Sequence, residues 1–177
     1  MVKKIALVLI YGVVLSYALI FFAPKKRLYY ALEHQLQRYG VVISDEALKE
    51  HPFGLEISHA ELFFKGIQSG FVKKVKFEVL LLSNEVLFED IRISSIAKSI
   101  IPTKIKTIKL HYGVVNPLYV VAQATGEFGS ASIEISLRER RVAVTLKPSP
   151  LMRQKYARTL RMMHKNNNGE YTYARSF

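Results

Sequence analysis

From Val41 to Pro148, apolar and polar residues alternate with a period of two, interrupted by turns that contain Gly, Asn or Pro. Such alternation is typical of strands that bury one face, and the short spacing between turns favours antiparallel pairing. The pattern therefore predicts a mainly β domain with an antiparallel sheet of about eight or nine short strands. Representative runs are VKKVKFEV, GSASIEIS and RVAVTL.

The alternation changes phase within several of these runs. In HPFGLEISHAELFFKG, Leu55 and Ile57 are apolar at odd positions, whereas Ala60 and Leu62 are apolar at even ones. The same change occurs in EVLFEDIRI and in KIKTIKLHYG. Each change fits either a β-bulge, which keeps the apolar side inward, or a tight turn between two shorter strands. Several bulges in neighbouring strands would curl the sheet into an open trough or partial barrel.

The N-terminal segment differs from the rest of the chain because Ile5 to Ala23 carries no formal charge. As a helix these residues extend about 28 Å, close to the hydrocarbon thickness of a bilayer. A cleaved signal peptide is the main alternative, but the run is long and no small-x-small pattern precedes Pro24. We therefore expect a single transmembrane helix. Basic residues flank it on both sides, so charge alone leaves the orientation open: Lys3, Lys4, Lys25, Lys26 and Arg27.

Two short helices are expected to flank the sheet. The segment 27–40 places Leu28, Leu32, Leu36 and Tyr39 on one stripe, suited to packing on the sheet or to lying on a membrane interface. After the sheet, Ser149 is a candidate N-cap with Pro150 in the first turn, and a second stripe comprises Leu151, Tyr156, Leu160 and Met163. The predicted organisation is a membrane anchor (1–27), an amphipathic helix (28–40), the β domain (41–148) and a basic C-terminal helix and tail (149–177).

Composition narrows the functional classes. The 177 residues include no cysteine, which excludes disulfides, thiolate metal sites and cysteine catalysis. The formal net charge is +12, so an anionic partner must be considered. Residues 151–177 contain six Lys or Arg and one Glu, with three tyrosines between them. Beside a membrane anchor, this tail favours anionic lipid headgroups over a nucleic acid partner.

Catalytic and metal-binding patterns are weak. The five histidines show neither HxH nor HxxxH spacing, and the acidic residues form no convincing catalytic pair. Ser95-Ile96-Ala97-Lys98 matches an SxxK motif, but no KTG or SDN partner follows it. We therefore expect a protein that is not an enzyme and has no cofactor.

The apolar positions of the predicted strands supply a candidate groove. Such a groove would hold apolar ligands if it were left open, whereas the same residues would form an ordinary core if the two helices filled it; ordinary core is the more common role for such side chains. The candidate residues are Leu55, Ile57, Phe64, Phe77, Val79, Phe88, Ile133 and Ile135.

The order of a single span, a short helix ending in Tyr-Gly and the segment PFGLEI resembles type II secretion system protein N and the related AsmA-like envelope proteins. The matching positions in this segment are Pro52, Gly54, Leu55 and Ile57. The C-terminal segment GEYTYARSF, with Gly169, Tyr171 and Tyr173, resembles the tail of some members. The chain is shorter than the usual member, so a strand or two of that family's pattern is expected to be missing.

This resemblance implies an anchor in the inner membrane of a double-membraned bacterium, with the β domain in the periplasm. It also implies a non-enzymatic scaffold of a secretion or envelope-assembly apparatus, with protein partners. The alternative is a lipid-binding or lipid-transfer module that holds acyl chains on the concave face of the sheet. The anchor protein of lipopolysaccharide transport is an architectural parallel for this second function.

Overall fold

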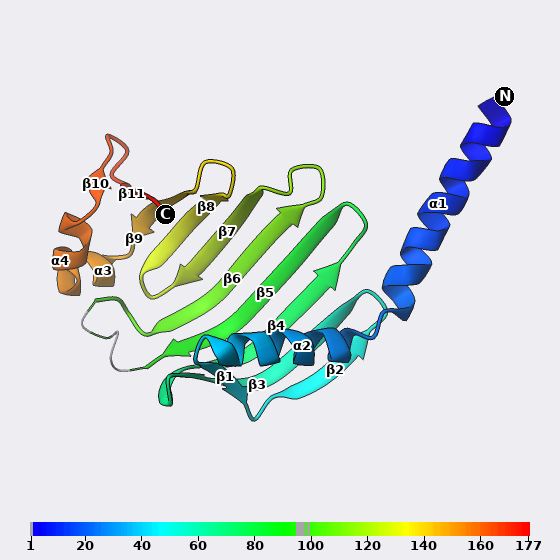
Figure 1. The fold of residues 1–177 in the computed structure, drawn as a ribbon. Helices are drawn as coiled ribbons and strands as arrows, with labels where there is room; N and C mark the ends of the chain where they lie inside the picture. The colour runs from blue at the N-terminus through cyan, green and yellow to red at the C-terminus, as the bar shows by residue number, and fades with distance from the viewer. Residues whose placement is uncertain (1, 95–97, 99) are drawn as a thin grey trace.

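A computed structural model describes residues 2–94, 98 and 100–177. The chain forms an N-terminal helix, a second helix and an antiparallel sheet, with two short helices inserted before the last two strands (Figure 1). The helices are α1 (Val2–Phe22), α2 (Lys25–Arg38), α3 (Pro150–Lys155) and α4 (Ala157–Arg161). The strands are β1 (Val41–Ser44), β2 (Ala47–His51), β3 (Gly54–Phe64), β4 (Ile67–Val79), β5 (Ser83–Ile93), β6 (Lys104–Gly113), β7 (Tyr119–Gly126), β8 (Gly129–Ser136), β9 (Arg141–Pro148), β10 (His164–Lys165) and β11 (Tyr171–Ser176).

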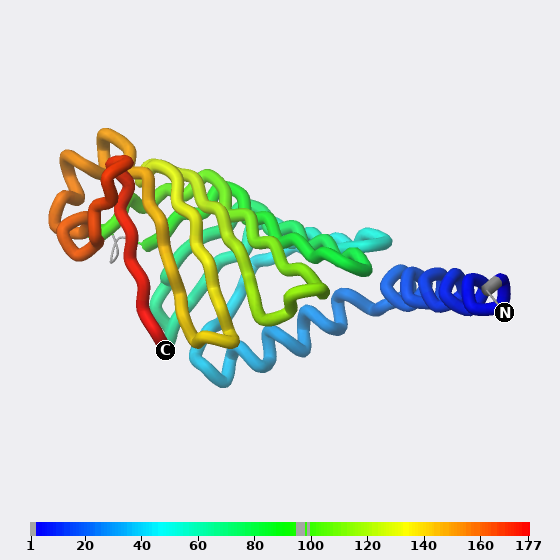
Figure 2. Tube along the Cα trace, turned by 90° about the horizontal axis from the view of Figure 1, so that it is seen from above, coloured from blue at the N-terminus to red at the C-terminus, as the bar shows by residue number. Residues whose placement is uncertain are grey.

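The predicted fold class is confirmed: the domain is a curved, open antiparallel sheet behind an apolar N-terminal helix. The strand order is β1-β3-β4-β5-β6-β7-β8-β9-β11-β10, and β2 also pairs with β3. Figure 2 shows that the sheet curls around the side on which α2 lies. Over the described residues the two ends of the strand order do not pair with each other, so the sheet remains a trough.

The described residues form eleven strands, whereas the sequence predicted eight or nine. Three of the eleven lie outside the alternating pattern on which that prediction was based. β2 occupies residues 47–51, a mainly polar stretch without the alternation of the main strands, and it pairs along the start of β3. In the tail, β11 pairs with β9 through Tyr171 and Leu146, and the two-residue β10 pairs with β11. These strands are stabilised by their partners, since their own sequences lack an extended alternation.

α1 is long and apolar enough to cross a bilayer, in agreement with the predicted span. Its C-terminal end is tied to the domain. Lys25 donates hydrogen bonds from Nζ to the carbonyl oxygens of Phe21 and Ala23, at 3.0 and 3.2 Å. The backbone N–H of Lys26 donates to Oε1 of Glu50 in β2, at 2.8 Å.

The phase changes align in a row across four strands, which we call the crease: His59, Lys73, Asp90 and Lys106. The register between β3 and β4 is the same on both sides of it, with Ser58 opposite Lys74 and Ala60 opposite Val72. The strands therefore run through these positions, and the turn interpretation is wrong.

His59 and Asp90 adopt φ of 60° and 51°, a conformation that His and Asp tolerate better than most residues. Because neighbouring strands change phase at the same row, each keeps its apolar side inward without shifting against the next. A register shift appears at the border of the crease, between Ile105 and Thr107, where β6 meets β7. Beyond it, β7 to β9 alternate strictly.

Two packed clusters form the core on the concave face. The first lies under α2 and contains the buried Tyr29, Leu55, Ile57, Ala60, Val72, Val75 and Ile91. The second lies under α3 and α4 and contains the buried Ala124, Phe128, Leu146, Met152 and Leu160. The opposite face is polar and carries cross-strand ion pairs such as Lys109–Glu85 at 2.9 Å and Lys74–Glu56 at 3.0 Å.

The predicted apolar stripe of α2 is wrong as a packing face. Tyr29 is buried and Leu36 is half-buried, whereas Leu28 is 62% exposed and Tyr39 is 75% exposed. α2 is thus rotated so that the ring of Tyr29 enters the core while Leu28 and Leu32 face the rim of the trough. A large buried aromatic ring removes more apolar surface from water than a leucine does, which favours this rotation.

The C-terminal helix is broken in two at Tyr156, whose φ and ψ are −120° and 27°. Ser149 caps α3 as predicted, since its Oγ accepts a hydrogen bond from the Met152 N–H at 3.1 Å and Pro150 occupies the first turn. The break changes the helical phase, so that Met152 rather than Leu151 is buried. Tyr156, Leu160 and Met163 pack in the second cluster, as the sequence predicted.

Candidate apolar trough

The eight candidate groove residues are distributed between core, rim and open surface of the concave side. Leu55 and Ile57 are buried, and Phe77 and Phe88 pack partly buried against them. Val79 lies exposed at the end of β4, and Phe64 lies at the opposite end of the sheet, 5.5 Å from Lys65 Nζ. Ile133 and Ile135 are half-buried in β8 and belong to neither packed cluster.

Strand register extends the surface around Ile133 and Ile135 into a continuous apolar area. Ile133 lies opposite Ala122 on β7 and Val144 on β9, and Ile135 lies opposite Val120 and Val142. One strand further, Leu110 lies opposite Ala122. We call six half-buried residues of this area the open half of the trough: Leu110, Val120, Ile133, Ile135, Val142 and Val144.

The helices leave this area uncovered. α2 packs over β1 to β3, and α3 packs beside β9 at the far end of the sheet. In the part of the chain that the structure describes, none of the six residues packs in either cluster. The concave face therefore carries a packed cluster under α2 and another under α3 and α4, and between them an apolar surface that no helix covers.

A separate apolar cleft lies beside α2. It has a volume of about 190 Å³ and lies between α2 and the ends of β3 and β4. Its lining is almost wholly apolar, with Lys25 at the mouth: Leu28, Tyr29, Leu32, Gly54, Leu55, Phe77 and Val79. The exposed side chains of α2 thus face a space large enough for part of an acyl chain. The sequence did not reveal this cleft, because the stripe containing Leu28 and Leu32 suited either packing on the sheet or a membrane interface.

Tyr29 sets the position of α2 beside this cleft. Its hydroxyl is buried close to Glu46 but forms no hydrogen bond of good geometry. Burial raises the pKa of Tyr29 above its ordinary value, and the nearby negative charge of Glu46 raises it further. The phenol is consequently neutral throughout the physiological pH range, which is compatible with its apolar surroundings.

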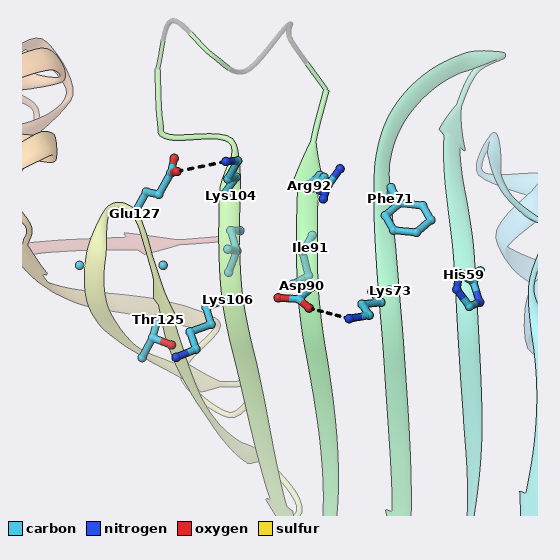
Figure 3. A pocket seen from close by; sticks show the side chains of 13 residues that line it. His59, Phe71, Lys73, Asp90, Ile91, Arg92, Lys104, Lys106, Thr125 and Glu127 are labelled. Carbon is cyan, nitrogen blue, oxygen red and sulfur yellow. Dashed lines mark ion pairs between the residues drawn. The ribbon is translucent and has the colours of Figure 1, made fainter.

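The polar face has a separate, wide depression at the crease, with a volume of about 1080 Å³ (Figure 3). Two ion pairs cross its lining, Lys73–Asp90 at 3.4 Å and Lys104–Glu127 at 3.9 Å. Both are solvent-exposed, and exposed pairs of this kind contribute little to stability. The ion pairing and the openness of the depression make it a poor match for the enclosed, convergent sites that bind small molecules.

Two other candidate chemistries considered from the sequence are a metal site and the SxxK motif. Among residues 2–94, 98 and 100–177, no group of three or more His, Asp or Glu side chains is placed to hold a metal ion. Ser95 of the SxxK motif lies outside the described residues. Comparison of the chain with protein-family models, curated proteins and solved structures found no match.

Proposed function

We propose that this chain is a non-enzymatic, membrane-anchored module that holds lipid acyl chains against the open half of the trough. The observation that carries the proposal is the continuous apolar surface over β6 to β9, which the helices leave uncovered. A monomeric soluble protein rarely exposes such a surface unless it binds an apolar partner. The cleft beside α2 offers a second apolar space, at the ends of β3 and β4.

The resemblance to type II secretion system protein N and AsmA-like proteins supports the same proposal. It implies that α1 lies in a bacterial inner membrane and that the sheet lies in the periplasm. In that compartment an open apolar trough would shield acyl chains from water between the two membranes. The hydrophobic effect gives roughly 0.8 kcal/mol for each methylene buried, so even a short length of acyl chain would be held measurably.

Binding is tested with a phospholipid that carries a photoactivatable group on its acyl chain. The full chain is reconstituted with this lipid, illuminated and digested, and the adducts are mapped by mass spectrometry. We expect adducts on β8 and β9 as well as on α1, which serves as the internal reference. Ile133→Asp should reduce the sheet adducts several-fold, because it places a charge on the apolar face.

Ser132→Asp is the matched control, since it introduces the same residue into the same strand on the polar face. It should leave the sheet adducts at the parental level. Adducts confined to α1 in the parent chain would contradict lipid binding in the trough. Equal loss in both variants would show that the sheet, rather than its apolar face, had been disrupted.

The proposed compartment is tested by adding one cysteine to a chain that has none. Gln68 is exposed near the turn between β3 and β4, at the end of the sheet away from α1. After the outer membrane is permeabilised, Gln68→Cys should react with an impermeant maleimide in intact cells. Reaction only after lysis would place the sheet in the cytoplasm, and a denatured sample controls for thiol reactivity.

A scaffold function is the second candidate, favoured by the outer edge of β11. β10 pairs only with Tyr171 and Thr172, so the outer edge of residues 173–176 carries no strand in the described part of the chain. An unpaired edge of this kind can accept a strand from a protein partner. If the parent chain formed no lipid adducts on the sheet, the scaffold function would be preferred.

A further inference from the structure

The turns at one end of the sheet form a row that begins beside α1. The ring of Phe53 lies edge-on to Tyr17 and Phe21 of α1, with ring centroids 6.1 and 6.0 Å apart. The carbonyl of Phe53 accepts a hydrogen bond from the Val79 N–H at 2.7 Å, which joins this contact to the end of β4.

The same pattern continues from turn to turn. The Val114 N–H donates to the Leu82 carbonyl at 3.1 Å, and the Leu137 N–H donates to the Leu118 carbonyl at 2.8 Å. The turns that follow β4, β6 and β8 are therefore held side by side. Figure 1 shows that α1 leaves the domain toward the side on which these turns project.

These turns carry large exposed hydrophobic residues, although turns usually contain Gly, Asn, Asp, Pro and Ser. Val115 is 87% exposed at the tip of the turn between β6 and β7. The complete set is Leu80, Leu82, Val114, Val115, Leu118 and Leu137, which we call the turn-tip row. The opposite end also exposes large hydrophobic residues, but these lie away from α1: Tyr39, Phe64, Ile67, Ile100 and Met162.

Basic residues accompany the turn-tip row. Arg138 and Arg140 lie on either side of Glu139 in the turn between β8 and β9, and Arg141 begins β9; all four are exposed, with a net positive charge. Lys25, Lys26 and Arg27 lie at the junction of α1 and α2. Exposed apolar residues flanked by Lys and Arg are the chemistry that binds an anionic bilayer surface.

We propose that the turn-tip row rests on the bilayer that α1 spans, with its apolar side chains at the boundary between headgroups and acyl chains. This inference rests on the membrane anchor of the proposed function. It adds that the acyl chains bound in the trough come from the membrane that α1 spans. Because the cleft beside α2 and the ends of β4 to β9 lie at this edge of the sheet, the trough opens onto the bilayer. Acyl chains of that same membrane would then reach the concave face without crossing water.

The absence of tryptophan from the chain allows a direct test. Val115→Trp provides a single fluorophore in the turn-tip row, and Ile67→Trp provides a matched one at the opposite end, where Ile67 is 56% exposed. Each full-length variant is reconstituted into vesicles of phosphatidylethanolamine and anionic phosphatidylglycerol, with or without bromine on the acyl chains. Leu82→Trp is a second reporter in case Val115→Trp disturbs its turn.

We expect the emission of Val115→Trp to shift to shorter wavelength and to be quenched by the brominated lipid several-fold more than that of Ile67→Trp. If both variants floated with the vesicles and their Trp fluorescence were quenched equally, the docking of the turns would be overturned while the anchor would stand. Failure of the chains to float with the vesicles would overturn the anchor itself, and with it this inference. Photoadducts on β8 and β9 test the trough independently of either outcome.

Discussion

Gly54→Ala is expected to lower the free energy of unfolding by about 3 kcal/mol, at the upper end of the usual cost of overpacking. A Cβ atom at this position would lie 2.1 Å from the carbonyl oxygen of Phe77. That oxygen belongs to the backbone of β4, so it cannot move away as a flexible side chain would. The strain would fall on the β3–β4 ladder where it borders the cleft beside α2. Denaturant titration of the full chain in detergent, followed by circular dichroism, measures the loss.

Gly113→Ala is the matched control for this substitution. No heavy atom lies within 4 Å of the position that its Cβ would take, and its φ lies outside the left-handed region. We expect its stability to remain within about 1 kcal/mol of the parent, because alanine fits such a position without strain. If both variants lost the same stability, the close approach of β3 and β4 at Gly54 would be refuted.

Met152→Ala is expected to cost about 2–5 kcal/mol, the usual range for truncating a fully buried long side chain. Met152 is 1% exposed and packs with Phe128, Leu146 and Leu160 in the second cluster. α3 has only six residues, so its position depends on this contact rather than on its own helical stability. Met162→Ala, at a position that is 65% exposed, should stay within about 0.5 kcal/mol of the parent.

The loss of Met152 has a second expected consequence at the trough. α3 and α4 cover the end of β9 farthest from α1, so loosening them would lengthen the uncovered apolar surface. The Met152→Ala chain should therefore bind more of a hydrophobic fluorescent dye than the parent or Met162→Ala under native conditions. Equal dye binding by all three chains would mean that these helices do not close the trough.

The residues that carry the family resemblance have structural roles in this chain. Gly54 is required by the close approach of the Phe77 carbonyl, and Leu55 and Ile57 are buried in the first cluster. A one-sided sheet that packs against a helix would need such residues whatever it binds. The PFGLEI segment is therefore explained by packing within this sheet, and function must be argued from the open half of the trough.

The sequence alone determined the antiparallel sheet, the apolar N-terminal helix and the inward side of each main strand. Alternation with a period of two assigns faces locally, and the phase changes at His59 and Asp90 mark where the strands are irregular. Whether these irregularities were turns depended on the neighbouring strands. Since His59 and Asp90 lie in one row with Lys73 and Lys106 of the neighbouring strands, the strands continue through these positions without a turn.

Only the tertiary structure decided which apolar residues are core and which are open surface. Ile57 and Ile133 have the same alternation in sequence, yet Ile57 lies in the cluster under α2 while Ile133 lies outside both clusters. The rotation of α2 around Tyr29 and the break at Tyr156 likewise depend on what each helix meets. Periodicity encodes the side of a strand on which a residue lies. Whether that residue is buried depends on which segments, distant in the chain, pack over it.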